Sequence, residues 1–213
     1  MRSNLGGNVP IRAQRTGGEY SPAMQIKTQR LVLREFVQAD WPDVLRYQSD
    51  PRYLRYYPWS DRTEDDVRDF VDSQIAHQSE SPRRKFQLVI TLPDQPGLIG
   101  NCGIRRKSDN DFEADIGYEL SPERWGRGYA TEAASAMVDF GFQELGLNRV
   151  SSWSIADNAG SANVLEKVGL KLEGRLRSNE YFKGRWWDTL LHGMLRDEWT
   201  GPGSIQSLSV GQP

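Results

Sequence analysis

Hydrophobic and polar positions in the first half of the chain follow patterns typical of antiparallel strands. Residues 31–36 alternate apolar and polar side chains, as expected for a strand with one buried face. Three further β-rich runs follow at 86–92, 98–105 and 113–120. They are separated by turn-forming residues at 93–97 and 109–111. Two turns at this spacing predict an antiparallel meander of three strands.

Helical spacing of apolar residues predicts two helices between the first strand and the meander. Asp40 is a candidate N-cap for the first, with Pro42 in its first turn. The second helix is expected to begin at Ser60 or Thr63, because Thr63 and Asp66 resemble a capping box with Asp in place of Glu or Gln.

The second half of the chain alternates strands and helices. A long helix follows residue 128 and carries one apolar stripe, formed by Ala130, Ala133, Ala134, Met137, Val138 and Phe142. The elements expected after it are a strand at 150–155, a helix at 160–168 ended by Gly169, and strands at 171–177 and 187–195. This order predicts an α/β fold with a mixed sheet, in which the strands flanking the long helix are parallel neighbours.

The turn between the strand at 113–120 and the long helix is basic and rich in glycine. It contains Arg124, Gly126, Arg127 and Gly128. Glycines allow a ligand to approach the backbone, and the first turn of a helix offers free N–H groups and the positive end of the helix dipole. These features together predict an anion site, most often one for phosphate. The chain lacks the Gly-Lys-Ser/Thr of a nucleotide P-loop and the dinucleotide spacing Gly-x-Gly-x-x-Gly at this turn.

This stretch, Trp125-Gly-Arg-Gly-Tyr-Ala130, resembles the pyrophosphate loop of the GCN5-related N-acetyltransferases (GNAT), with Trp125 where Gln or Arg is usual. The resemblance is to the branch of the ribosomal-protein N-terminal acetyltransferases (RimJ/RimL-like). Three other stretches are similar to that branch in the same order: 28–36, 158–170, and the final strands with Glu173-Gly174, Trp187-Asp188 and 195–199. The resemblance implies the GNAT fold, with an N-terminal meander and a parallel pair that splays apart at the cofactor site.

The resemblance also implies acetyl-CoA as co-substrate and an amine as acceptor, either a protein N-terminus or a small molecule. The loop would hold the pyrophosphate, and the strand before it would hold the pantetheine arm in the manner of an added strand. The residues expected to bind acetyl-CoA are Tyr118, Glu119, Leu120, Trp125, Gly126, Arg127, Gly128, Tyr129, Ala130, Thr131, Asn158 and Ser161. The aromatic segment 53–59 is expected either to cover the core or to line the acceptor groove.

Acetyl transfer to an amine requires a hydrogen-bond donor at the thioester carbonyl, for which the Leu120 N–H is the candidate, and a base that removes the amine proton. The resemblance implies Glu180 as that base, and Asp115 and Glu119 remain alternatives. Many acetyltransferases place a tyrosine acid where this chain has Leu165, and the branch implies Ser161 as the acid instead. Without the usual acid, a non-catalytic acyl-CoA-binding or regulatory domain is the competing interpretation.

Composition limits the partners and the cellular compartment that we expect for this protein. The 213 residues carry a net charge of −2, so nothing favours nucleic acid or an anionic membrane as partner. Cys102, the single cysteine, excludes an internal disulfide and suits a reducing, cytoplasmic compartment. No apolar run approaches a membrane span, and no usual metal site is expected. We expect a mobile extension at 1–24, one domain at 25–200 and a frayed tail at 201–213, in a monomer or homodimer.

Overall fold

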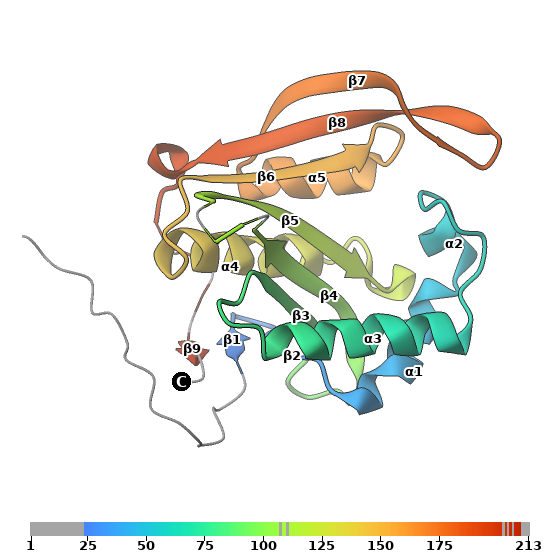
Figure 1. Cartoon of the computed structure of the whole chain (residues 1–213), viewed down its shortest axis with the longest axis horizontal. Helices are drawn as coiled ribbons and strands as arrows, with labels where there is room; N and C mark the ends of the chain where they lie inside the picture. The colour runs from blue at the N-terminus through green and yellow to red at the C-terminus, as the bar shows by residue number, and fades with distance from the viewer. Residues whose placement is uncertain are drawn as a thin grey trace, which may run out of the picture.

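The computed structural model describes residues 24–106, 108–109, 111–201, 203, 205 and 207–209. The extension expected at 1–24 lies outside these residues except for Met24, which is buried in the core. Figure 1 shows a twisted sheet with helices on both faces.

The described residues form one sheet of nine strands in the order β7-β8-β6-β5-β4-β3-β2-β1-β9. The strands are β1 (Gln25–Lys27), β2 (Val32–Glu35), β3 (Lys85–Thr91), β4 (Leu98–Arg105), β5 (Glu113–Leu120), β6 (Arg149–Ile155), β7 (Lys171–Phe182), β8 (Arg185–Leu195) and β9 (Ser207–Ser209). Strands β3, β4 and β5 form the predicted antiparallel meander. Strands β5 and β6 are parallel, and the other paired strands are antiparallel, so the predicted mixed sheet is confirmed.

Two groups of helices cover the two faces of the sheet (Figure 1). The helices are α1 (Trp41–Gln48), α2 (Pro51–Leu54), α3 (Glu64–Gln78), α4 (Tyr129–Gln143) and α5 (Ala159–Val168), with 3-10 turns at Gln38–Asp40, Pro122–Arg124 and Arg196–Glu198. Residues of α1, α2 and α3 form one apolar cluster with Val89 and Leu98. Helices α4 and α5 pack on the opposite face.

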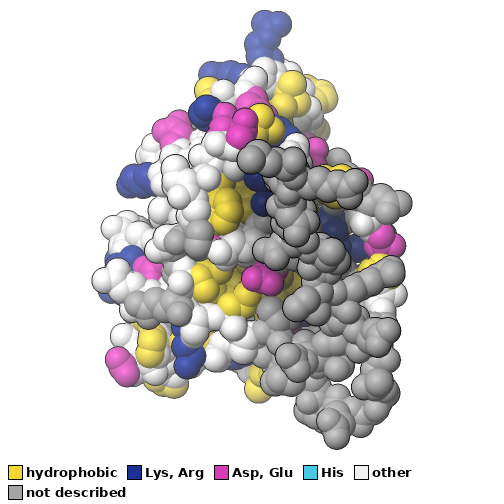
Figure 2. All heavy atoms as spheres, turned by 90° about the vertical axis from the view of Figure 1, so that its left-hand side faces the viewer, with side chains coloured by type: hydrophobic (Ala, Val, Ile, Leu, Met, Phe, Trp, Pro, Cys, Tyr) yellow, Lys and Arg dark blue, Asp and Glu magenta, His cyan; other side chains and the backbone are white. Residues whose placement is uncertain are grey.

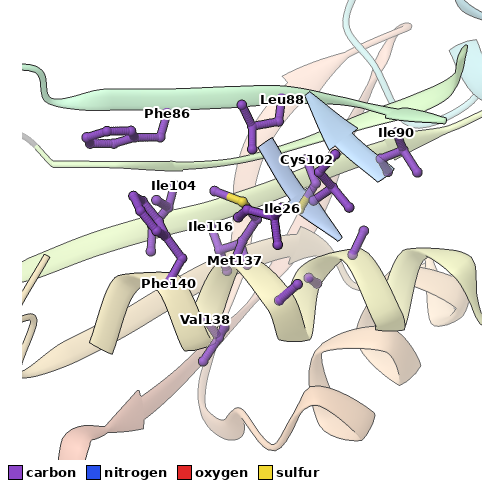
Figure 3. Packing of buried hydrophobic residues seen from close by; sticks show 14 of the residues in the cluster. Ile26, Phe86, Leu88, Ile90, Cys102, Ile104, Ile116, Met137, Val138 and Phe140 are labelled. Carbon is purple, nitrogen blue, oxygen red and sulfur yellow. The ribbon is translucent and has the colours of Figure 1, made fainter. Parts of the chain in front are cut away.

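The larger core lies between α4 and the sheet (Figure 3). Alternate residues of β3, namely Phe86, Leu88 and Ile90, point toward α4, where Met137 and Phe140 meet them. The apolar stripe predicted for α4 is therefore the face that packs on the sheet. Of its six residues, Ala130 is partly exposed and the other five are buried.

Cap chemistry explains where α3 begins. The Thr63 hydroxyl accepts from the Asp66 N–H at 3.2 Å, and the Asp66 carboxylate accepts from the Thr63 N–H at 2.9 Å, so the predicted capping box is confirmed. Asp40 behaves differently. Its side chain makes no cap hydrogen bond to α1, because it accepts from the Val37 N–H and pairs with Arg34 at 2.7 Å.

Three features at the sheet edges differ from the sequence analysis. The short strand β1 was not predicted. The tail expected to fray at 201–213 pairs with β1 through Ser207–Ser209, and Leu208 packs against the core. The last hairpin is longer than predicted, because β7 runs to Phe182 and turns at Lys183–Gly184. Edge pairings of three residues carry too little alternation to be recognised from sequence.

Charges of both signs are interspersed over the visible part of the face in Figure 2, with small apolar patches between them. This distribution agrees with the small net charge of −2. None of the helices within the described part of the chain has the length and apolar character needed to cross a membrane.

Candidate functional site

The parallel strands β5 and β6 separate after a short pairing, and the opening between them is the centre of the site. They pair over Glu113–Asp115 and Arg149–Ser151. Beyond this, the Ser152 hydroxyl donates to the Ile116 carbonyl oxygen at 2.8 Å. The other edge of β5 stays paired with β4 as far as Leu120. The splay leaves one edge of β5 open toward a cleft of about 1570 Å³.

Backbone direction in β5 decides which groups face this cleft. The Ser121 N–H donates to the Ile99 carbonyl oxygen at 2.8 Å, on the β4 side. Because successive residues of a strand direct their backbone groups to opposite edges, Leu120 and Tyr118 face the opening, and the backbone of Glu119 faces β4. The Leu120 carbonyl oxygen accepts from the Trp125 indole N–H at 2.8 Å. The backbone groups available to a ligand are therefore those of Tyr118 and the N–H of Leu120.

The glycine-rich turn and the start of α4 form the next part of the cleft wall. Gly126 and Gly128 adopt left-handed φ angles of 73° and 79°, which explains why glycine stands at both positions. Gly128 is the N-cap of α4 and supplies no side-chain acceptor, so the first N–H groups of the helix have no side-chain cap. Of the residues predicted to bind acetyl-CoA here, the cleft is lined by Trp125, Gly126, Gly128, Tyr129, Ala130 and Thr131. Arg127 is not among the lining residues.

The start of α5 forms the opposite wall. Asn158 caps α5, and its side-chain oxygen accepts from the Ser161 N–H at 3.2 Å. The Tyr118 hydroxyl donates to the Ser161 carbonyl oxygen at 2.8 Å and lies 3.0 Å from the Ser161 hydroxyl. Burial raises the pKa of Tyr118, so its hydroxyl stays protonated. Leu165 is fully buried, which fits its packing role in α5.

Glu119 lies on the floor of the cleft and is held by hydrogen bonds. Its Oε2 atom accepts from the Tyr47 hydroxyl at 2.9 Å, the Gln48 amide at 2.9 Å and the Asn101 amide at 3.0 Å. Burial and the neighbouring Glu119 charge raise the pKa of Tyr47, which keeps that hydroxyl a donor. Sequence reasoning missed these three partners. The available signal was the polar Asn101 within an otherwise apolar strand.

The other two carboxylates weighed as bases lie in different surroundings. Asp115 lines the cleft and pairs with Arg105 at 2.6 Å. Glu180 lies within β7 opposite Trp187, rather than in the turn where it was expected. Its Oε1 atom accepts from the Asn179 amide at 3.4 Å, and Glu180 is not among the residues that line the cleft.

Aromatic residues form the wall on the α2 side. Tyr53 and Tyr57 stack at 4.5 Å, and both line the cleft with Tyr56. The Tyr56 ring meets the Trp187 ring edge to face at 6.0 Å, and its hydroxyl donates to the Asp157 carbonyl oxygen at 2.9 Å. These rings pack against core clusters and also line the cleft, so the expected core role of segment 53–59 is confirmed, and its role in an acceptor groove stays a prediction.

Comparison with known proteins identifies the family to which this chain is similar. Residues 30–171 match the family described as acetyltransferase (GNAT) domain. The chain is 33% identical over 176 residues to the uncharacterized N-acetyltransferase YnaD of Bacillus subtilis, covering 83% of this chain and 99% of YnaD. In the described part of the chain, no group of three or more His, Cys, Asp or Glu side chains is placed to hold a metal ion.

Solved structures agree. A GNAT-family acetyltransferase from Bacillus anthracis superposes with a TM-score of 0.72 at 29% identity, covering 81% of this chain and 99% of the other. The ribosomal L7/L12 α-N-protein acetyltransferase RimL, in complex with coenzyme A, gives a TM-score of 0.72 at 18% identity, covering 82% and 99%. The splayed strands, the glycine turn at the start of α4 and the sequence match lead to one conclusion: this chain belongs to the GNAT family of N-acetyltransferases.

Proposed function

We propose that the protein transfers an acetyl group from acetyl-CoA to a primary amine by direct attack within a ternary complex. The observation that carries this proposal is the open edge of β5 beside the uncapped start of α4. That arrangement suits an extended pantetheine arm and a pyrophosphate at once. The acceptor is a protein N-terminal amine, as the name of the RimL neighbour suggests, or a small-molecule amine.

In this proposal the coenzyme is held mainly by backbone groups. The amides from Trp125 to Ala130 bind the pyrophosphate, and Thr131 lies in the same first turn of α4. The free backbone groups of Tyr118 pair with the pantetheine arm. The Leu120 N–H donates to the thioester carbonyl, where negative charge develops as the amine attacks.

The amine must lose a proton to attack. Glu180 was the base implied by resemblance, and it remains a prediction for mutation to test. The geometry favours Glu119 as the base, because it lines the cleft and its Oε2 atom takes all three hydrogen bonds named above. The Oε1 atom takes none of these three bonds. Asp115 is the third candidate, and its carboxylate is paired with Arg105 at 2.6 Å.

The departing thiolate takes up a proton. Ser161 is the proposed source, and its hydroxyl lies 3.0 Å from that of Tyr118. The Tyr118 hydroxyl holds Ser161 in place by donating to its carbonyl oxygen at 2.8 Å, and position 165 carries a leucine in place of the usual tyrosine acid.

One experiment tests this function. The purified protein is incubated with acetyl-CoA and a mixed panel of peptides and small amines, release of free CoA is measured, and products are identified by mass spectrometry. Acetylated product that depends on both substrates supports the proposal. Binding of coenzyme A without transfer to any acceptor would favour the competing function, a non-catalytic acyl-CoA-binding domain.

A further inference from the structure

Arg30, in the turn between β1 and β2, contacts the glycine-rich turn across a gap of almost one hundred residues. Its Nη1 atom donates to the Arg127 carbonyl oxygen at 3.0 Å, and its guanidinium lies over the Tyr129 ring, 4.9 Å from the ring centroid. A Cβ placed on Gly128 would lie 3.3 Å from Arg30 Nη2. The guanidinium therefore sits directly against the start of α4.

Glu132 fixes Arg30 in this position. The Glu132 carboxylate accepts from the Arg30 backbone N–H at 2.8 Å, from Arg30 Nε at 2.7 Å and from the Thr28 hydroxyl at 2.6 Å. Its side chain is only 13% exposed, whereas that of Arg30 is 45% exposed. Burial alone would raise the pKa of Glu132, but the hydrogen bonds from Thr28 and Arg30 outweigh it and hold the pKa below its ordinary value.

The contact with Arg127 has a consequence for the turn. In a planar trans peptide the C=O and the following N–H point in opposite directions. Because the Arg127 carbonyl is turned toward Arg30, the Gly128 N–H is directed away from Arg30. Gly128 lines the cleft, and Arg30 does not. Arg30 therefore binds the carbonyl side of the Arg127–Gly128 peptide, and the N–H of the same peptide is available to the proposed pyrophosphate site.

Charge gives Arg30 a second effect. A carboxylate in the first turn favours the helix itself, but at the same place it repels an anionic ligand. Arg30 Nη2 lies 2.7 Å from Glu132 Oε2 and neutralises that charge beside the turn. Loss of Arg30 alone would leave an uncompensated carboxylate next to the phosphates.

We propose that Arg30, held by Glu132, is a positioning residue that orients the Arg127–Gly128 peptide and neutralises Glu132 so that the turn binds the pyrophosphate of coenzyme A. This inference rests on the proposed use of acetyl-CoA. The two relevant stretches, 28–36 and 125–134, are far apart in the sequence, and nothing in their patterns links Arg30 to Glu132.

The test compares two acyl donors that differ in the pyrophosphate. Acetyl-CoA carries it and S-acetylpantetheine lacks it. In Arg30→Ala, kcat/KM for acetyl-CoA should fall by about 10- to 100-fold, the usual effect of losing hydrogen bonds that involve charged groups, and KM should change more than kcat. The value for S-acetylpantetheine should stay unchanged. Arg30→Lys keeps the charge and should restore part of the loss.

Calorimetry with coenzyme A separates this inference from the proposed function. The Kd for coenzyme A should rise in Arg30→Ala by the same factor as KM, whether or not the wild type transfers acetyl groups. Arg46→Ala, which removes an exposed arginine paired with Asp43 on α1, is the matched control and should match the wild type. An equal fall with both donors, or an unchanged Kd for coenzyme A, overturns the inference. A wild type that binds no coenzyme A overturns both proposals.

Discussion

The half of the cleft proposed to bind the coenzyme is built mostly from backbone groups close together in sequence, whereas the half proposed to bind the acceptor is built from side chains of distant elements. Turn, cap and helix start in the first half all lie within residues 118–131. The second half joins Tyr47 of α1, Asn101 of β4 and Glu119 of β5 through one carboxylate. Local glycine and cap chemistry can therefore encode the proposed anion site, whereas the proposed acceptor site depends on the completed fold.

The largest effect should come from a substitution that blocks coenzyme A binding at the glycine-rich turn. Gly128→Glu places a side chain and a negative charge at the N-cap of α4, at a φ of 79° that disfavours any residue with a Cβ. We expect the rise in Tm caused by coenzyme A to disappear. Thermal unfolding with and without coenzyme A measures it.

The matched control is Gly146→Glu. Gly146 also has a left-handed φ, of 64°, and open space around its Cβ position, but it lies beyond the far end of α4. This variant introduces the same charge and a similar backbone strain, and it should keep the coenzyme A response. If Gly128→Glu keeps that response as well, the turn is not the pyrophosphate site.

The next effect should separate the two halves kinetically. Glu119→Gln keeps the shape of the side chain and removes its basicity, so kcat should fall by about 10²- to 10⁴-fold while the Kd for coenzyme A stays nearly constant. The loss should shrink at high pH, where the amine is already neutral. Turnover over a range of pH measures both effects.

Glu180→Gln and Asp115→Asn test the other two candidate bases in the same way. A collapse of turnover in Glu180→Gln with normal turnover in Glu119→Gln would return the base to β7, as the family resemblance implied. If none of the three matters, the amine loses its proton through water and the enzyme works mainly by positioning.

A smaller effect should follow from weakening the support of Glu119. Tyr47→Phe removes one of its three donors and leaves the ring packed beside Tyr53, 5.4 Å away. The Gln48 and Asn101 amides still hold the Glu119 carboxylate in this variant, so kcat should fall by less than in Glu119→Gln. An equal change in the Kd for coenzyme A would show that the two halves are not independent.

Sequence reasoning recovered the parts of the molecule that depend on local patterns. The meander, the parallel pair and the capping box at Thr63 all follow from local patterns and their order along the chain. The place of Glu180 could not be predicted in this way, because β7 runs to Phe182, five residues beyond the predicted end at 177, and includes Glu180. The partners of Glu119 were also missed, since no local pattern records which side chains a sheet and a helix bring together.

The smallest expected effect concerns His192 in β8, and it matters for interpreting every pH profile above. His192 is 1% exposed, and neither ring nitrogen has a hydrogen-bond partner among the described residues. Burial lowers its pKa below the ordinary value, so the folded protein binds fewer protons than the unfolded chain. The free energy of unfolding should therefore decrease as the pH falls below about 6.5, with a slope of at most about 1.4 kcal/mol per pH unit, until the pKa of the folded state is reached.

His192→Leu should remove this part of the pH dependence while leaving turnover at neutral pH unchanged, since His192 does not line the cleft. Urea unfolding of both proteins between pH 7.5 and about 5 measures the difference in slope. A parallel pair of curves would mean that His192 is already charged or hydrogen-bonded in the folded state. A loss of slope would assign this part of the acid sensitivity of the fold to His192 in β8.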